Sequence, residues 1–290
     1  MLGGELESIK GGNIMKSRTV YVVLGLFLAV ALVALAAPAS AEMFVEGYLG
    51  GTAAANMGQN FVVHESQSPP PPREMEDDIG DFHLNYPGKT DPSVIGGVKL
   101  GTWFVKEGFA GWSGYPDWCR YFGFYTDFSY QRLEMPHQRL SGGNYFNNGA
   151  PENIVEGCIS SDGMAATWAF MFAGRYGFYP DSEVPFGRLQ PYVAVGPAVM
   201  FTTMHPTLLA NGLSMNGGGN TQAVIALSVE SGIRYMATKN VSLDLSFKYR
   251  YAQPSFSFSG INAADGLPAS FKLNPTYNLF SGELGVAYHF

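Results

Sequence analysis

The sequence predicts an all-β protein: an eight-stranded antiparallel up-and-down transmembrane β-barrel with short periplasmic turns and long extracellular loops. The first observation is an alternation with a period of two. From Val241 to Tyr251, apolar residues at odd positions alternate with polar or charged residues at even positions, and the run from Phe280 to Phe290 repeats the pattern. A soluble sandwich buries its apolar face, whereas a transmembrane barrel turns that face to lipid.

The second observation is an export signal, which favours the barrel. Residues 15–41 are typical of a secretory signal peptide, with Lys16 and Arg18 ahead of a long apolar core. The small residues Ala39 and Ala41 form a cleavage site, so cleavage is expected after Ala41. An uncleaved membrane anchor is the weaker alternative. The expected location is the bacterial outer membrane.

The remaining chain is interpreted as one domain, the barrel of residues 42–290. Residues 1–14 are interpreted as a non-native upstream extension, with the natural start at Met15. The reason is that Lys10–Gly12 matches a purine-rich ribosome-binding site read as protein.

The charge balance excludes some partners. The whole chain has 17 basic and 24 acidic residues, and removing residues 1–41 takes away three and two of these, which leaves a net charge of −8. Nucleic acid is therefore not an expected partner, since phosphate binding needs clustered Lys and Arg. No segment of residues 42–290 approaches the ~20 apolar residues of a spanning helix.

Eight segments of the chain alternate between apolar and polar residues. Each has close to the ~10 residues that a tilted strand needs to cross a bilayer. They are residues 43–53, 93–106, 120–132, 165–178, 189–202, 222–237, 241–253 and 278–290. The expected periplasmic turns are the shorter connections 107–119, 179–188 and 238–240. The expected extracellular loops are 54–92, 133–164, 203–221 and 254–277.

A ten-stranded barrel is the alternative, because residues 59–64 would supply one more strand. The run Pro69–Pro72 follows at once and argues against a hairpin partner, since proline cannot donate to a ladder. Eight strands is therefore the predicted count.

Aromatic residues gather on the faces predicted to contact lipid. Trp112, Tyr115 and Trp118, just before the third strand, are expected at the periplasmic headgroup level. The aromatic residues that share one face of the third and fourth strands are Phe122, Phe124, Phe128, Tyr130, Trp168, Phe170, Phe172, Tyr176 and Phe178.

The opposite faces carry charges of both signs, predicted to form a network in the lumen. Five acidic and five basic residues belong to it: Glu46, Lys99, Asp127, Arg175, Glu230, Arg234, Asp244, Lys248, Arg250 and Glu283. An eight-stranded barrel is about wide enough for its own side chains. Balanced charges there favour a paired plug, whereas a selective pore would more often carry an excess of one sign.

The turn at Thr238–Asn240 predicts two pairs in this network. A three-residue loop, with Asn240 in the left-handed conformation, places Arg234 opposite Asp244. The same register places Glu230 opposite Lys248.

The chain resembles small bacterial outer-membrane barrels of the OmpA transmembrane-domain, OmpX and opacity-protein type. The resemblance rests on the signal peptide, the opening Phe44–Gly51, the alternating segments and the closing Gly285–Phe290. In such proteins a closing pattern like Tyr288 and Phe290 is the signal read by the barrel-assembly machinery, so this machinery and outer-membrane lipid are the implied partners. The family implies a fold and a location but no single function.

No enzyme activity and no cofactor or metal are expected. A barrel hydrolase acting on lipid A would need Ser and His on adjacent outward positions near the outer rim, but His289 is predicted at the periplasmic end, facing inward. The acidic first loop, from His64 to His83, matches no cation-binding pattern. Cys119 and Cys158 are predicted at opposite ends of the third strand and are not expected to form a disulfide.

The expected function is a structural or surface-interaction role, through extracellular loops that would bind an unknown ligand. A small channel for small or hydrophobic solutes is the first alternative. A lipid A-modifying enzyme is the second.

Overall fold

The computed structural model describes residues 42–55, 60–65, 81–105, 116–145, 151–210, 213–261 and 268–290. The interpretations of residues 1–14 and of the signal peptide at 15–41, with its cleavage site, lie outside the described residues. Glu42–Phe290 forms one compact unit. No helix among the described residues is long and apolar enough to cross a membrane.

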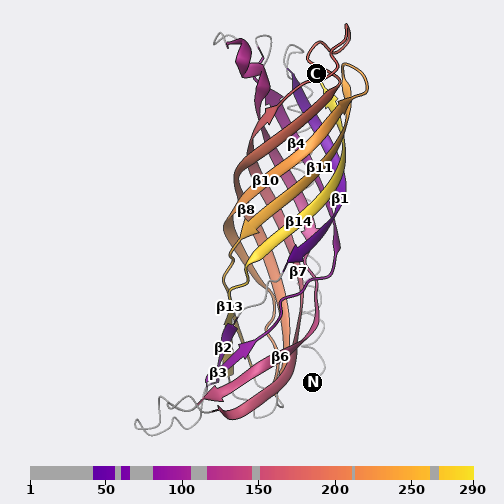
Figure 1. The fold of residues 1–290 in the computed structure, drawn as a ribbon. Helices are drawn as coiled ribbons and strands as arrows, with labels where there is room; N and C mark the ends of the chain where they lie inside the picture. The colour runs from indigo at the N-terminus through magenta and orange to yellow at the C-terminus, as the bar shows by residue number, and fades with distance from the viewer. Residues whose placement is uncertain are drawn as a thin grey trace, which may run out of the picture. The chain divides into compact units, whose positions relative to one another are not determined.

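Eight long antiparallel strands form a closed barrel (Figure 1), which confirms the predicted fold class. They are β1 (Met43–Ala55), β4 (Ser93–Trp103), β5 (Phe122–Arg132), β7 (Pro151–Arg175), β8 (Leu189–Ala210), β10 (Asn220–Met236), β11 (Val241–Ala252) and β14 (Tyr277–His289). Each pairs with the next in this order, and β14 returns to pair with β1 from Phe44↔His289 to Ala55↔Asn278. Closure leaves the barrel without a free edge.

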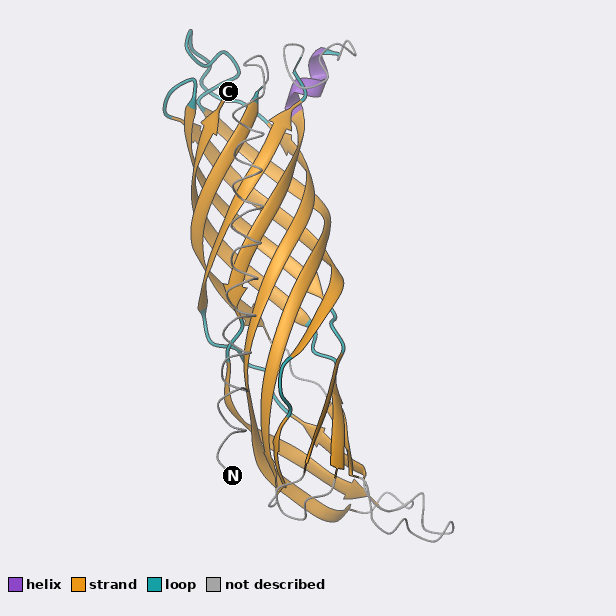
Figure 2. Ribbon diagram, turned by 180° about the vertical axis from the view of Figure 1, so that it is seen from behind, coloured by secondary structure: helices purple, strands orange, loops and turns teal. Residues whose placement is uncertain are grey.

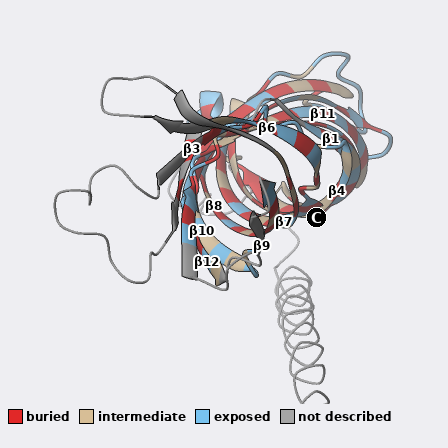
Figure 3. Cartoon of the chain, turned by 90° about the horizontal axis from the view of Figure 1, so that it is seen from below, coloured by how far each residue is buried: buried red, intermediate tan, exposed pale blue. Residues whose placement is uncertain are grey.

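Along each barrel strand, buried and exposed residues alternate (Figure 3). In β11 the polar residues Ser242, Asp244 and Lys248 are buried, whereas Leu243 and Leu245 are exposed. This is the reverse of a soluble protein, since the polar face is inside and the apolar face outside. The exposed aromatic residues on this outer face include Phe122, Tyr130, Trp168, Phe172, Tyr176, Phe178, Phe247, Phe280 and Tyr288.

The periplasmic end carries short connections and the C-terminus (the upper end in Figure 1). A 3-10 helix, η3 (Asp117–Tyr121), precedes β5 (purple in Figure 2), so the strand predicted from residue 120 begins at Phe122. Trp118 in η3 is exposed and packs edge-on against Phe122, 5.9 Å between ring centroids. Trp112 and Tyr115 lie outside the described residues.

The turn between β10 and β11 differs from the prediction in one respect. Among the described non-glycine residues only Tyr179 has a positive φ. The prediction that Asn240 adopts the left-handed conformation is therefore wrong. The Thr238 hydroxyl instead accepts hydrogen bonds from the Asn240 and Val241 amides, at 3.2 and 3.1 Å, which closes the turn without that conformation. The predicted register is nevertheless confirmed, with Glu230 opposite Lys248.

The long extracellular connections are not the loops that the sequence predicts. They carry six further strands: β2 (Asn60–Glu65), β3 (Asp81–Asn85), β6 (Met135–Tyr145), β9 (Leu213–Asn216), β12 (Phe256–Ile261) and β13 (Pro268–Leu273). Strands β7 and β8 run on past the other barrel strands, and the six pair beside them in the order β12-β13-β2-β3-β6-β7-β8-β9. We call this sheet the extracellular extension (lower part of Figure 1).

The argument against a hairpin partner for residues 59–64 is also wrong. β2 pairs with β3, whose residues follow the Pro69–Pro72 run, so the proline segment lies between the two strands instead of in either. The hairpin joins the extracellular extension, not the barrel, and the barrel count stays at eight.

The inner face of the extracellular extension is mostly apolar, with Gln138 and Ser161 as buried polar residues beside it. Its buried apolar residues are Phe61, Val63, Leu84, Tyr86, Met135, Leu140, Ile159, Leu208, Phe256, Phe258, Phe271 and Leu273. Their rings pack on one another, with Phe258 stacked on Phe271 at 5.1 Å and Phe61 edge-on to Tyr86 at 5.8 Å. Rings packed in this way form an apolar core, which lies at the extracellular end of a barrel whose lumen is charged.

Candidate functional site: the charged lumen

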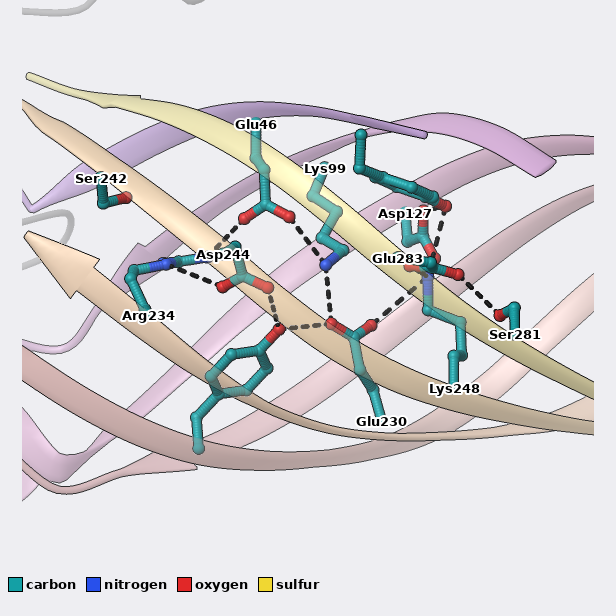
Figure 4. Close-up of polar contacts among 12 residues, drawn as sticks. Glu46, Lys99, Asp127, Glu230, Arg234, Ser242, Asp244, Lys248, Ser281 and Glu283 are labelled. Carbon is teal, nitrogen blue, oxygen red and sulfur yellow. Dashed lines mark hydrogen bonds and ion pairs between the residues drawn. The ribbon is translucent and has the colours of Figure 1, made fainter. Parts of the chain in front are cut away.

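All ten charged residues assigned to the lumen from the sequence are buried, each at most 6 % exposed. Nine of them form one continuous ion-pair network, contributed by six strands. Figure 4 shows this network without Arg250. Their positions along the strands explain this burial. Each lies an even number of residues from buried neighbours on the same strand, so its side chain points into the lumen. Arg175 is the tenth and lies apart.

Lys248 is the centre of one half of the network. Its Nζ lies 2.8 Å from Asp127 Oδ2, 2.8 Å from Glu283 Oε2 and 3.4 Å from Glu230 Oε2. Arg250 Nη2 is 3.1 Å from the same Asp127 oxygen. One ammonium group therefore holds carboxylates from three other strands.

Lys99 and Arg234 organise the other half. Lys99 Nζ lies 2.8 Å from Glu46 Oε1 and 2.6 Å from Glu230 Oε1. Arg234 lies 2.5 Å from Glu46 and 3.2 Å from Asp244, the partner that the turn register predicts. Because Glu230 contacts both Lys99 and Lys248, the two halves form one chain of alternating charge.

Two tyrosines complete the network and are absent from the sequence-based set. The Tyr48 hydroxyl donates to Asp127 Oδ1 at 2.7 Å and accepts from Lys248 Nζ at 3.2 Å. The Tyr192 oxygen lies 2.6 Å from Glu230 Oε1 and 2.8 Å from Asp244 Oδ1. Both residues lie at inward-facing positions of their strands, and the alternation therefore could have identified them. The prediction considered only charged residues at such positions.

Arg175 forms a second, smaller cluster at the periplasmic mouth of the barrel. Its guanidinium is sandwiched between the rings of Trp103 and Phe186, 4.1 Å from each centroid. It donates to Gln190 Oε1 at 3.1 Å and pairs with Glu42. Glu42 is also missing from the sequence-based set. The cluster places two aromatic rings and a paired charge at the periplasmic end of the lumen.

A serine and a histidine on the inner side of the barrel wall contact each other near the periplasmic mouth. His289 Nε2 lies 2.8 Å from Ser242 Oγ, and the His289 ring contacts Phe44 at 5.8 Å. The histidine is at the periplasmic end and faces inward, as predicted. Both side chains are buried on the inner side of the barrel wall.

The two cysteines occupy opposite ends of the structure. Cys119 is buried in η3 at the periplasmic end, and Cys158 lies in the part of β7 that belongs to the extracellular extension. β5 begins opposite Gly174 of β7, sixteen residues from Cys158, which corresponds to about 50 Å of strand. Both thiols are free, and this distance forbids a bridge.

On the periplasmic side, Arg188 links two turns. It pairs with Asp181, lies 2.8 Å from Glu183, and donates to the carbonyl oxygens of Met236 and Ala237 at 3.2 and 3.1 Å. A hydrogen bond from the Val184 amide and the pairing with Arg188 lower the pKa of Asp181, and Arg188 lowers that of Glu183. We call this group the periplasmic clamp.

The lowered pKa values make the periplasmic clamp dependent on pH. Carboxylates whose pKa is lower in the folded state stabilise the turn above their unfolded pKa, near 4, and that stabilisation is lost as pH falls through the folded values. Hydrogen-exchange protection of the Val184 amide is therefore expected to decline below about pH 4. In Arg188→Gln the protection is expected to be weak at every pH, whereas unchanged protection in that variant would contradict the assignment.

The lumen network combines charges of both signs with a bridging hydroxyl group. The network has five carboxylates and four cationic groups, and Tyr192 bridges two of the carboxylates with its hydroxyl. Charges buried in this way are tolerated only when paired and hydrogen-bonded. Among the described residues, no group of three or more His, Cys, Asp or Glu side chains is placed to hold a metal ion.

A closed eight-stranded barrel with an apolar exterior and a charged interior defines a class: the protein is an outer-membrane β-barrel. Among solved structures, the outer membrane protein OprG from Pseudomonas aeruginosa is similar, at 14 % identity over 87 % of this chain and 97 % of that chain, with a TM-score of 0.44. Neisserial surface protein A is similar at 13 % identity over 86 % and 97 %, with a TM-score of 0.40.

The attachment invasion locus protein Ail of Yersinia pestis, in complex with a heparin analogue, is similar at 11 % identity over 86 % of this chain and 99 % of that chain. Its TM-score is 0.31. Because the identities and TM-scores are this low, the similarities carry no argument of their own. The fold assignment rests on the strand pairing. No protein-family model and no curated protein matches the sequence.

Proposed function

We propose that the protein is a non-conducting outer-membrane barrel that holds a structured β-sheet extension at the cell surface for interaction with an extracellular ligand. The observation that carries the proposal is the continuous ion-pair network across the lumen. The contact between Lys248 and Glu230 joins its two halves inside the lumen, and both residues are at most 1 % exposed. A solute would have to break several of these contacts to pass.

The extracellular extension supports the surface role. Its inner face is a packed apolar core, whereas the outward positions that lie beside it along the strands are polar, among them His137, Arg139, Ser257 and Lys272. A polar, rigid sheet is a suitable platform for recognition, since ordered elements lose little entropy on binding. Catalysis has no comparable support, and we propose none.

Assembly is the second part of the proposal. Tyr288 is exposed on the lipid side of β14, and its ring packs edge-on against Phe290 at 5.2 Å. The Phe290 amide donates to the Met43 carbonyl at 3.0 Å, across the seam where the barrel closes. We infer that these two aromatic residues present the signal to the barrel-assembly machinery before β14 meets β1.

The test of the plugged lumen is conductance in a planar bilayer. A sample that gives a heat-modifiable band on electrophoresis, and is therefore folded, is expected to give no discrete conductance steps. Large and stable steps from the same folded sample would overturn the plug and support the alternative, a small channel. A folded sample with no steps directs the search for function to the extracellular extension.

A further inference from the structure

A groove crosses the outer, lipid-facing surface of the barrel near its periplasmic end. Its floor is a row of cross-strand neighbours that includes Gly174, Val193, Ser231 and Gly282, and its volume is about 800 Å³. An added Cβ on Gly174 or Gly282 would meet no atom closer than 4.0 Å. The floor is therefore open at Gly174 and Gly282, where no neighbouring side chain fills it.

Bulkier residues form the two walls. On the periplasmic side, Ile233 pairs with Leu245, and both are exposed. On the extracellular side lie Tyr249 and Phe280. Phe247 belongs to the floor row, but its ring stacks on Phe280 at 6.1 Å and so leans towards that wall. The result is an apolar channel one residue row wide.

The groove spans about one leaflet of the membrane. Its row begins at Phe122, the first residue of β5, and ends at Gly282, near the middle of β14. Five steps between strands of ~4.8 Å make it about 24 Å long. Because barrel strands tilt by ~35–45°, a row perpendicular to them rises by roughly 15 Å, half of the ~30 Å hydrocarbon core. The groove therefore lies in the inner leaflet.

Polar aromatic residues form a rim at the periplasmic end of the groove. The rings of Tyr121 and Tyr176 stack in parallel at 5.8 Å, with 8° between their planes. Arg120, exposed in η3, donates from Nη2 to the Tyr121 hydroxyl at 3.0 Å. Tyrosines at this level mark the headgroup region, and a guanidinium there is a strong donor to phosphate.

We propose that this groove is a binding site for an anionic glycerophospholipid of the inner leaflet. One acyl chain lies along the floor between Gly174 and Gly282, and the phosphate is held at Arg120 beside Tyr121. The surroundings argue for this occupant, because the face is in the membrane, where lipid is the solvent. The exposed guanidinium of Arg120 beside Tyr121 sets the direction of the lipid, with the headgroup towards the periplasm.

Native mass spectrometry of the folded protein, released from vesicles of equal parts phosphatidylglycerol and phosphatidylcholine, tests the site. The wild-type protein is expected to retain one phosphatidylglycerol. In Gly174→Leu the side chain fills the floor, and retention is expected to fall about tenfold, the loss that on the order of ten van der Waals contacts would cause. Arg120→Gln is expected to keep a lipid but to lose the preference for phosphatidylglycerol.

The matched control is Gly47→Leu, an outward glycine of β1 whose added Cβ meets nothing within 4 Å and which is not part of the groove. It is expected to retain lipid as the wild-type protein does, and a heat-modifiable band checks the fold of each variant. Equal retention in Gly174→Leu, equal loss in Gly47→Leu, or an unchanged preference in Arg120→Gln overturns the proposal. A wild-type dimer without lipid that Gly174→Leu dissociates overturns it too, because the occupant is then a second copy.

Discussion

Replacing Lys248 by alanine is expected to lower the free energy of unfolding by about 3–5 kcal/mol, the cost of removing one partner from a buried ion pair. The ammonium group contacts Asp127, Glu283 and Glu230, each from a different strand. Without it, Asp127 would keep Arg250 and Glu230 would keep Lys99, but Glu283 would lose the cation that it contacts, and the three carboxylates would repel one another. The penalty comes from stranded charge more than from lost attraction.

Denaturant titration of the protein folded in lipid vesicles measures this change. Lys272→Ala is the matched control, since Lys272 is exposed on the extracellular extension and an exposed charge contributes at most about 1 kcal/mol. Lys248→Arg keeps the charge and is expected to fall between the wild-type protein and Lys248→Ala. Equal stability of the two alanine variants would show that the network contributes nothing to the barrel.

The second large effect is expected on the outer surface. Leu284→Lys places a charge near the middle of β14, on a side chain that is 68 % exposed to the surroundings of the barrel. In water such a change at an exposed site would be nearly neutral. In the middle of a bilayer it is expected to cost ~2–4 kcal/mol.

Leu209→Lys is the control that separates water from lipid. Leu209 is also exposed, at 43 %, but it pairs with β9 in the part of β8 that continues into the extracellular extension. The same chemical change there is expected to cost little, again measured by denaturant titration in vesicles. If both variants lose the same free energy of unfolding, the outer surface around Leu284 is not in contact with hydrocarbon.

The barrel was predictable because its information is local. A period of two, read along Val241–Ala252 or Tyr277–His289, assigns each side chain to lipid or lumen without knowledge of its partners. A short turn then sets the register, so Glu230↔Lys248 follows from counting residues. The register depends only on the number of residues in the turn. The wrong conformation predicted for Asn240 therefore did not affect the predicted register.

The extracellular extension was not predictable in the same way. Its short strands β2, β3, β12 and β13 are separated by long connections, and β13 pairs with β2 across about two hundred residues. Propensity marked residues 59–64 as a strand, but nothing local names a partner so far along the chain. Non-local pairing is decided by the burial of apolar faces against one another, such as Phe258 on Phe271.

The sequence by itself determined the fold class, the strand count, the side of each wall residue and one register, because alternation and turn length are properties of single segments. Only the tertiary structure decided how the charges combine. Curvature brings Lys248 to Asp127 and Arg234 to Glu46 across the lumen, from strands that are not neighbours in the sheet. Closure of the barrel creates those contacts, and no pattern along one strand encodes a distance across it.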